Sequence, residues 1–138
     1  MSRLIEDIIG DLQMFDAMRD GWPKLESLVD ELKASPKPER AVHALFAVFE
    51  RYPGATTGGG VLMTVLHTLE ALAGFELCLV ESLRRRPSIL AVMLANRLLN
   101  SGINVVGTDS LLALLEVAKL GAQRIVREEI ESVLGGRA

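Results

Sequence analysis

Aromatic residues are scarce in this sequence, since Phe, Trp and Tyr make up only 4% of its 138 residues. Sheets favour aromatic and β-branched side chains, so this composition disfavours a β-rich domain. Apolar residues still amount to 49% of the chain, which is enough for a sizeable core of Leu, Val, Ala, Ile and Met. Such a core is typical of helices packed on helices.

Cysteine occurs only once, at Cys78, so an intrachain disulfide is excluded and a reducing compartment is indicated. Long apolar runs are also missing, because a stretch such as 89–95 falls far short of the roughly 18 residues that a membrane-spanning helix needs. Residues 1–12 carry acids where a signal peptide carries bases. We therefore expect a cytoplasmic protein that does not bind membranes.

Basic residues are not in excess, and the net charge is −3. Nucleic-acid binding usually needs a basic surface, so it is disfavoured. The acidic charge is concentrated at the start: residues 1–31 hold eight acids and three bases, whereas residues 32–138 carry a net charge of +2. An acidic surface there would attract a basic partner, although solvated helix faces have the same composition.

Apolar residues recur at helical spacing in eight segments. These are 3–19, 23–34, 38–52, 61–73, 75–86, 87–101, 109–119 and 122–134. Ser2 is a candidate N-cap for the first helix, and Thr108 or Asp109 for the seventh. The segment 103–107 is β-like but too isolated to form a sheet, and residues 135–138 are expected to fray.

This pattern predicts a single all-α domain over residues 1–138. Seven or eight short antiparallel helices would stack as a HEAT-like helical-repeat solenoid, because short helices joined by tight turns are typical of repeat proteins. An irregular globular helical bundle is the alternative. A four-helix bundle fits less well, since its helices are usually longer than these breaks permit.

Three local features have a structural and a functional interpretation. Trp22 at a helix junction is expected to fill the core, although a partner could also bind it. The glycines at 58–60 lack the Lys and Ser/Thr of a phosphate-binding loop, so we interpret them as a flexible connector. The arginines at 84–86 suit a helix C-terminus, and they could alternatively bind an acidic or phosphate-bearing partner.

No convincing catalytic constellation emerges, so we predict a protein that is not an enzyme and needs no cofactor or metal. His67 and Glu70 are three residues apart on one helix face, and we interpret them as a hydrogen-bonded pair inside the stack. Cys78 lies in an apolar stretch and is expected to be buried, because reactive cysteines need an electropositive site. A small enzyme using His67, Glu70 and Cys78, or a Cys–His pair with His43, is the alternative.

The central part of the chain resembles a known class of proteins. The segments that carry the resemblance are Phe49-Glu50-Arg51-Tyr52-Pro53, Leu66-His67-x-Leu69-Glu70, Val80-Glu81-Ser82-x-Arg84-Arg85-x-Pro87 and Asn96-Arg97-x-Leu99-Asn100-x-Gly102. Together they resemble small helical immunity proteins that are encoded beside bacterial polymorphic toxins, including contact-dependent and Rhs-type toxins. The resemblance covers about residues 45–116.

The resemblance implies a cytoplasmic, non-enzymatic protein that binds and neutralises one cognate toxin domain. No catalytic residue comes with it. The alternative is a helical-repeat adaptor for a partner that is not a toxin. The apolar content of the helices also allows a homodimer, since an exposed apolar patch could pair with a second copy.

Two sets of polar residues are candidates for partner contact. An acidic set on the first two helices suits a basic toxin domain and consists of Glu6, Asp7, Asp11, Asp16, Asp20, Asp30 and Glu31. A polar set along the central helices consists of His67, Glu70, Glu81, Asn96 and Asn100.

Overall fold

The chain folds into short helices, which confirms the all-α class. The computed structural model describes residues 3–137. Nine α-helices lie in this range: α1 (Ile5–Met14), α2 (Ala17–Asp20), α3 (Trp22–Lys33), α4 (Val42–Arg51), α5 (Val61–Glu70), α6 (Phe75–Arg85), α7 (Ile89–Asn100), α8 (Leu111–Gly121) and α9 (Arg124–Gly135). Two 3₁₀ turns, η1 (Pro38–Ala41) and η2 (Gly58–Gly60), and two strands, β1 (Val105–Val106) and β2 (Asp109–Ser110), complete the structure.

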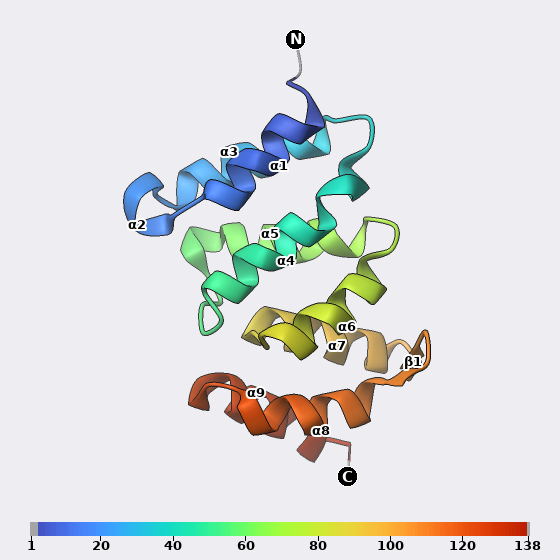
Figure 1. Ribbon diagram of the computed structural model, residues 1–138. Coiled ribbons are helices and arrows are strands. Elements are labelled where there is room, and N and C mark those ends of the chain that lie inside the picture. The colour runs from blue at the N-terminus through green and yellow to red at the C-terminus, as the bar shows by residue number, and fades with distance from the viewer. Residues whose placement is uncertain (1–2, 138) are drawn as a thin grey trace.

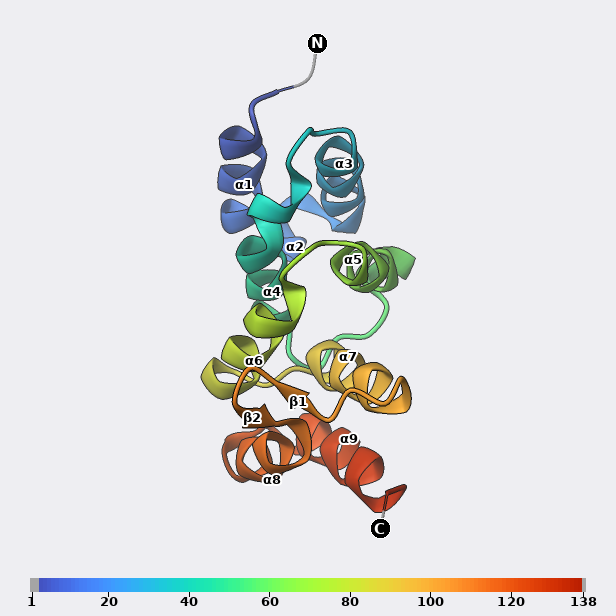
Figure 2. The ribbon, with the colours of Figure 1, turned by 90° about the vertical axis from the view of Figure 1, so that its right-hand side faces the viewer.

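The longer helices form four hairpins that stack along one axis (Figure 1). The pairs are α1 with α3, α4 with α5, α6 with α7, and α8 with α9. Helices α1, α4, α6 and α8 follow one another in one layer, and α3, α5, α7 and α9 follow one another in a second layer (Figure 2). The first and last described residues therefore lie at opposite ends of the stack (Figure 1).

One continuous apolar core runs between the two layers. It is built mainly from Leu, Val, Ala and Ile, as the composition predicts, and includes the fully buried Leu12, Leu45 and Leu66. Its few aromatic rings are clustered, and Phe46 and Phe49 pack edge to face with centroids 6.0 Å apart. In the described range 3–137, no helix has the length and apolar character needed to cross a bilayer.

The predicted first helix, 3–19, is broken in the structure. Helix α1 ends at Met14, and Asp16 begins α2 by accepting hydrogen bonds from the backbone N–H groups of Met18 and Arg19. Such an N-cap competes with continuation of the helix, which is why the periodicity alone missed the break. The Ser2 prediction lies outside the described residues; Leu4 occupies the N-cap position of α1.

An aromatic cluster covers this break. Trp22 lies 5.3 Å from Tyr52 and 5.8 Å from Phe15, measured between ring centroids. The ring of Trp22 is partly buried against the core, which agrees with its predicted structural role. The Tyr52 hydroxyl also accepts a hydrogen bond from Ala17 N over 2.8 Å, so α4 holds the start of α2.

The glycines of η2 are not merely a flexible connector. Gly58, Gly59 and Gly60 all have positive φ angles, and Gly58 is buried. A Cβ atom added at Gly58 would lie 2.9 Å from the Trp22 ring, whereas one added at Gly59 would meet nothing within 4 Å. The turn therefore needs glycine for its backbone at each position, and for close packing at Gly58.

A buried carboxylate joins the second and third hairpins. Glu50 on α4 is only 9% exposed. Its two oxygens accept hydrogen bonds from Arg85 Nε and Nη2, both over 2.7 Å, and from the Ser82 hydroxyl over 2.8 Å. Because the arginine fork is bidentate, it fixes the position of α6 against α4 as well as neutralising the charge. The hydrogen bond to Glu50 also raises the pKa of the Arg85 guanidinium.

Arg51 and Pro53, which follow Glu50, form hydrogen bonds with the first and third hairpins. Arg51 donates to the carbonyl oxygens of Leu12 over 2.7 Å and Gln13 over 3.1 Å, so it caps the C-terminus of α1. The carbonyl oxygen of Pro53 accepts a hydrogen bond from Ile89 N, at the start of α7. The segment 50–53 therefore connects the first, second and third hairpins.

The structure corrects three predictions in the second half of the chain. Residues 103–107 do contribute to a sheet, because β1 pairs antiparallel with β2 around Gly107, whose positive φ permits the tight turn. Helix α8 is capped by Ser110, which accepts from Ala113 N, rather than by Thr108 or Asp109. Helix α7 is capped by Ser88 in the same way, one residue after the predicted start at Pro87.

We predict that Arg85→Ala destabilises the protein by about 2 kcal/mol, because it leaves the buried Glu50 carboxylate without its charged donor. Arg86→Ala is the matched control, since Arg86 is exposed and makes no side-chain hydrogen bond or salt bridge to the rest of residues 3–137. It should change the free energy of unfolding by less than about 0.5 kcal/mol. Urea denaturation of both variants tests this, and equal effects would show that the Glu50 pair is dispensable.

Gly58→Ala should destabilise the protein more than Gly59→Ala. Both positions have positive φ and lose about 1 kcal/mol with a Cβ atom. Only Gly58→Ala also forces Cβ into the Trp22 ring, which adds roughly 1–3 kcal/mol of overpacking. Thermal or urea unfolding of the two variants measures the difference, and an equal loss would mean that Trp22 moves aside without cost.

Candidate functional site

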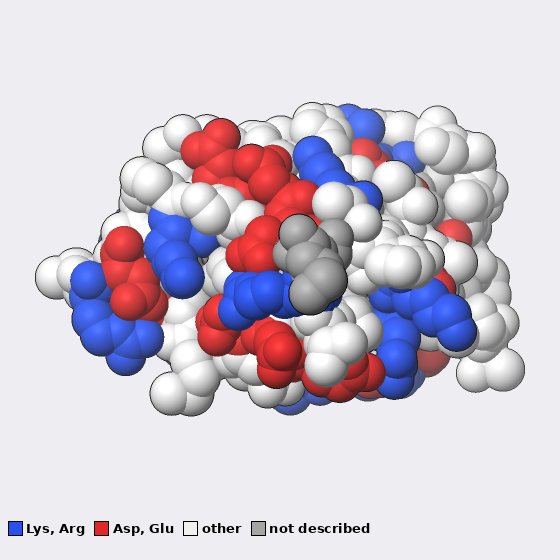
Figure 3. Space-filling view, turned by 90° about the horizontal axis from the view of Figure 1, so that it is seen from above, with Lys and Arg blue, Asp and Glu red and all other residues white. Residues whose placement is uncertain are grey.

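Acidic side chains gather at the end of the stack formed by α1 and α3 (Figure 3). Asp7 and Asp11 lie one turn apart on α1, and Glu26 and Asp30 lie one turn apart on α3. Arg3 joins the two helices: its Nη1 donates to Asp11 over 2.7 Å and its Nε to Glu31 over 2.8 Å. We call Asp7, Asp11, Glu26, Asp30 and Glu31 the acidic end face.

Part of this acidic charge is neutralised within the chain. The hydrogen bond from Arg3 lowers the pKa of the Glu31 carboxyl, and Glu6 pairs with Arg40 over 3.0 Å. Asp7, Glu26 and Asp30 are exposed and form no salt bridge with any other described residue. Glu26 was absent from the predicted set, although its spacing of four residues from Asp30 was a usable signal.

Two members of the predicted acidic set have local structural roles instead. Asp16 caps α2, as described above. Asp20, at the end of the same short helix, accepts hydrogen bonds from Arg19 and from Asp16 N, and these bonds lower the pKa of its carboxyl to about 2. Both carboxylates therefore accept hydrogen bonds within the segment between α1 and α3.

The second predicted set is divided between the two layers. His67 and Glu70 on α5 are 3.5 Å apart between Nδ1 and Oε1, but His67 is 59% exposed, so the pair lies on the surface rather than inside the stack. Glu70 also accepts from Arg97 Nε on α7 over 2.5 Å, and this bond raises the pKa of Arg97. The prediction missed Arg97 as the partner of Glu70.

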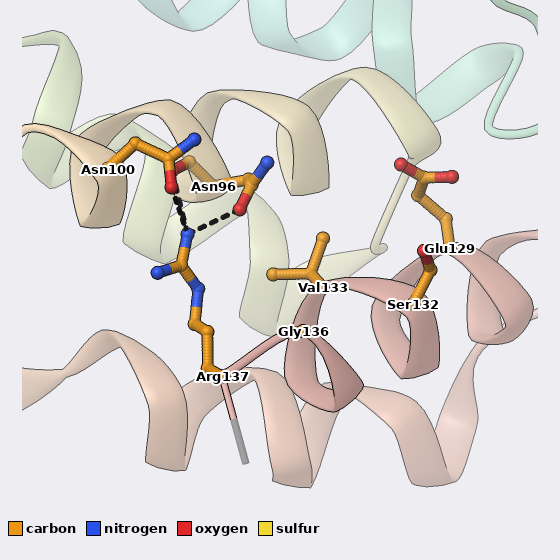
Figure 4. A pocket seen from close by; sticks show the side chains of 7 residues that line it. All are labelled: Asn96, Asn100, Glu129, Ser132, Val133, Gly136 and Arg137. Carbon is orange, nitrogen blue, oxygen red and sulfur yellow. Dashed lines mark hydrogen bonds between the residues drawn. The ribbon is translucent and has the colours of Figure 1, made fainter.

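Asn96 and Asn100 on α7 face Arg137, which follows α9 (Figure 4). They line a hollow of about 300 Å³ together with Glu129, Ser132, Val133 and Gly136. Arg137 Nη2 donates to the side-chain oxygens of both asparagines, so Arg137 is anchored and the predicted fraying of 135–138 is wrong at this residue. We call this hollow the asparagine groove.

Glu81 does not join the other members of its set. It lies on α6, in the opposite layer, with its Oε2 4.0 Å from Nδ1 of His43. The other ring nitrogen of His43 is 3.5 Å from the Cys78 sulfur. Burial, followed by the charge of Glu81, raises the pKa of the Cys78 thiol. The thiol is only partly buried, but it stays protonated at neutral pH, which opposes a nucleophilic role.

Two of the three arginines at 84–86 form ion pairs within the chain. Arg84 pairs with Asp109, and Arg85 pairs with Glu50. Only Arg86 is left with no salt bridge to the part of the chain that the structure describes. In that same part, no group of three or more His, Cys, Asp or Glu side chains is arranged to hold a metal ion.

We predict that Asp20 titrates with a pKa of about 2, well below its ordinary value of 3.8. Because the folded-state pKa is lowered, the stabilisation that this carboxylate gives to α2 is complete above the ordinary pKa and is lost as the pH falls towards 2. NMR titration of the side-chain carboxyl measures the pKa. In Arg19→Gln it should rise towards 3.8, and an unchanged value would contradict the assigned cause.

The comparisons with known proteins leave the family of this chain open. No protein-family model, no curated protein and no solved structure gave a match. The candidate surfaces are therefore assigned from their own geometry and charge.

Proposed function

We propose that this protein is an immunity protein, which binds a cognate toxin domain and neutralises it by direct contact. In this proposal the two-layer stack is a HEAT-like helical-repeat solenoid in the cytoplasm, and the acidic end face meets a basic surface of the toxin. The observation that carries it is the group of exposed carboxylates of Asp7, Glu26 and Asp30, for which the rest of the described chain supplies no cation. The resemblance of the central segments to immunity proteins is the reason for proposing a toxin domain as the partner.

Physical chemistry supports this choice of surface. Charges at an interface accelerate association and select partners of opposite sign. The face is built on two packed helices, and Arg3 holds Asp11 and Glu31 between them, so the carboxylates stand on a rigid base. Such a surface could cover a basic cleft without any chemistry of its own.

We predict that neutralising the unpaired carboxylates weakens toxin binding. The variant is Asp7→Asn, Glu26→Gln and Asp30→Asn. The control, Glu116→Gln, Glu128→Gln and Glu131→Gln, removes the same charge from α8 and α9, where each acid pairs with a basic residue of its own helix. We expect the first variant to lose at least about tenfold in affinity at low salt, mainly through slower association, and the control to lose little.

The toxin domain to use is the product of the neighbouring gene. Co-expression should protect cells from its toxicity, and surface plasmon resonance with the purified pair gives the affinities. Equal affinity of the two variants would refute the acidic end face as the binding surface. No complex and no protection would refute immunity and favour the adaptor, whose partner would then be sought among proteins that are not toxins.

A further inference from the structure

Helix α8 is apolar on its exposed side as well as on its buried side. Four of its residues are buried in the core: Leu111, Leu114, Leu115 and Ala118. On the opposite side Leu120 is 82% exposed, Val117 is 67% exposed and Leu112 is 38% exposed. We call these three residues, with the exposed Ala113 and Glu116 between them, the outer face of α8. A helix that is apolar all round is normally buried, so we expect another molecule to cover this face.

The other surfaces at the two ends of the stack are charged. The first hairpin carries the acidic end face. In the last hairpin, the exposed side of α9 carries the ion pairs Arg124–Glu128 and Arg127–Glu131. Terminal repeats of a helical stack need such polar surfaces to stay soluble, so the apolar character of α8 is an exception that marks an interface.

The outer face of α8 has no net charge to attract a charged partner. Glu116 is its only charged residue, and the carboxylate pairs with Lys119 of the same helix over 3.1 Å. A basic surface of the kind that suits the acidic end face would gain nothing here. A neutral apolar surface is the complement of this face, and α8 of a second copy provides one.

The sizes of the exposed side chains also suit a second copy. Ala113 and Leu120 are seven residues apart, so they lie two turns apart along one line of the helix. When two α8 helices pack antiparallel about a two-fold axis midway between these positions, Leu120 of each copy lies opposite Ala113 of the other. Large residues opposite small ones allow two helices to pack closely. Val117 and Glu116 then lie beside their counterparts near the axis, and each Glu116 keeps its own Lys119.

The area of the contact indicates a weak dimer. An 11-residue helix is about 16 Å long, so a pair of α8 helices covers less than the roughly 800 Å² per copy of a standard interface. A hollow of about 240 Å³, which Val117 lines together with Leu83 and Pro87 of the neighbouring hairpin, adds apolar surface beside α8. We expect a Kd on the order of 10–100 µM for a contact of this size.

We propose that the outer face of α8 binds the same face of a second copy, in an antiparallel pair that makes the protein a weak homodimer. This inference goes beyond the proposed function and does not depend on it, because the contact needs no toxin. Helix α8 lies at the opposite end of the stack from α1 and α3 (Figure 1). Both acidic end faces of the dimer therefore stay free, and one dimer can bind two partner molecules.

An exchange of the residues at positions 113 and 120 tests the pairing. Ala113→Leu adds apolar surface, but it puts a second large side chain opposite Leu120, so it should weaken the dimer at least about tenfold. Ala113→Leu with Leu120→Ala again sets a large residue opposite a small one, and should dimerise within about threefold of the wild type. Sedimentation velocity from about 1 to 500 µM measures the change from the 15.0 kDa of one copy to twice that mass.

Leu120→Lys should remain monomeric over the same range, because it puts a charge into the apolar contact. Met18→Lys is the matched control, since it makes the same change at a 94% exposed residue of α2 and should dimerise like the wild type. Urea denaturation shows that each variant is folded. A monomeric wild type, assemblies larger than two copies, equal dimerisation of the two lysine variants, or stronger association of Ala113→Leu would overturn the proposal. A monomeric wild type that still binds the toxin would overturn it and leave the proposed function standing.

Discussion

The buried carboxylate of Glu50 is the interaction on which the stack depends. Burying an ionised group is costly unless donors surround it, and here Arg85 and Ser82 supply three hydrogen bonds from the neighbouring hairpin. An apolar contact between α4 and α6 could slide, whereas a bidentate ion pair accepts one register. The adjoining residues 51–53 form hydrogen bonds with α1, α2 and the start of α7. One short segment thus joins the first, second and third hairpins.

This arrangement separates the residues that build the stack from those that are available to a partner. Six residues of the segments on which the proposed resemblance to immunity proteins rests have partners within the chain: Glu50, Arg51, Tyr52, Ser82, Arg84 and Arg85. These six residues therefore position helices and are not available to a partner. The unpaired carboxylates of the acidic end face lie on α1 and α3, away from these six residues. In the proposed function, partner specificity would change on this face without disturbing the contacts between hairpins.

Helical periodicity was enough to predict the fold class, and most helices lie within one to three residues of their predicted bounds. It did not predict the break at Phe15 and Asp16, because the Asp16 N-cap competes with helix continuation there. Tyr52 and Arg51, which are distant in sequence, hold the two sides of the break. The hairpin of β1 and β2 was missed because the second strand is only Asp109–Ser110 and has no alternating pattern. Among the candidate residues, spacing along a helix correctly paired His67 with Glu70, but it could not place Glu81 in the other layer. The pairing of Arg97 with Glu70, and the bonds from Arg137 to the two asparagines, were missed because these partners lie on different elements.

The most direct test of the proposed binding surface is hydrogen–deuterium exchange of this protein, alone and mixed with the product of the neighbouring gene, which the proposed function takes as its partner. Backbone amides exchange more slowly where a partner covers a surface or stabilises the helices beneath it. The account predicts slower exchange in α1 and α3 on complex formation. Protection confined to other helices, with α1 and α3 unchanged, would contradict it.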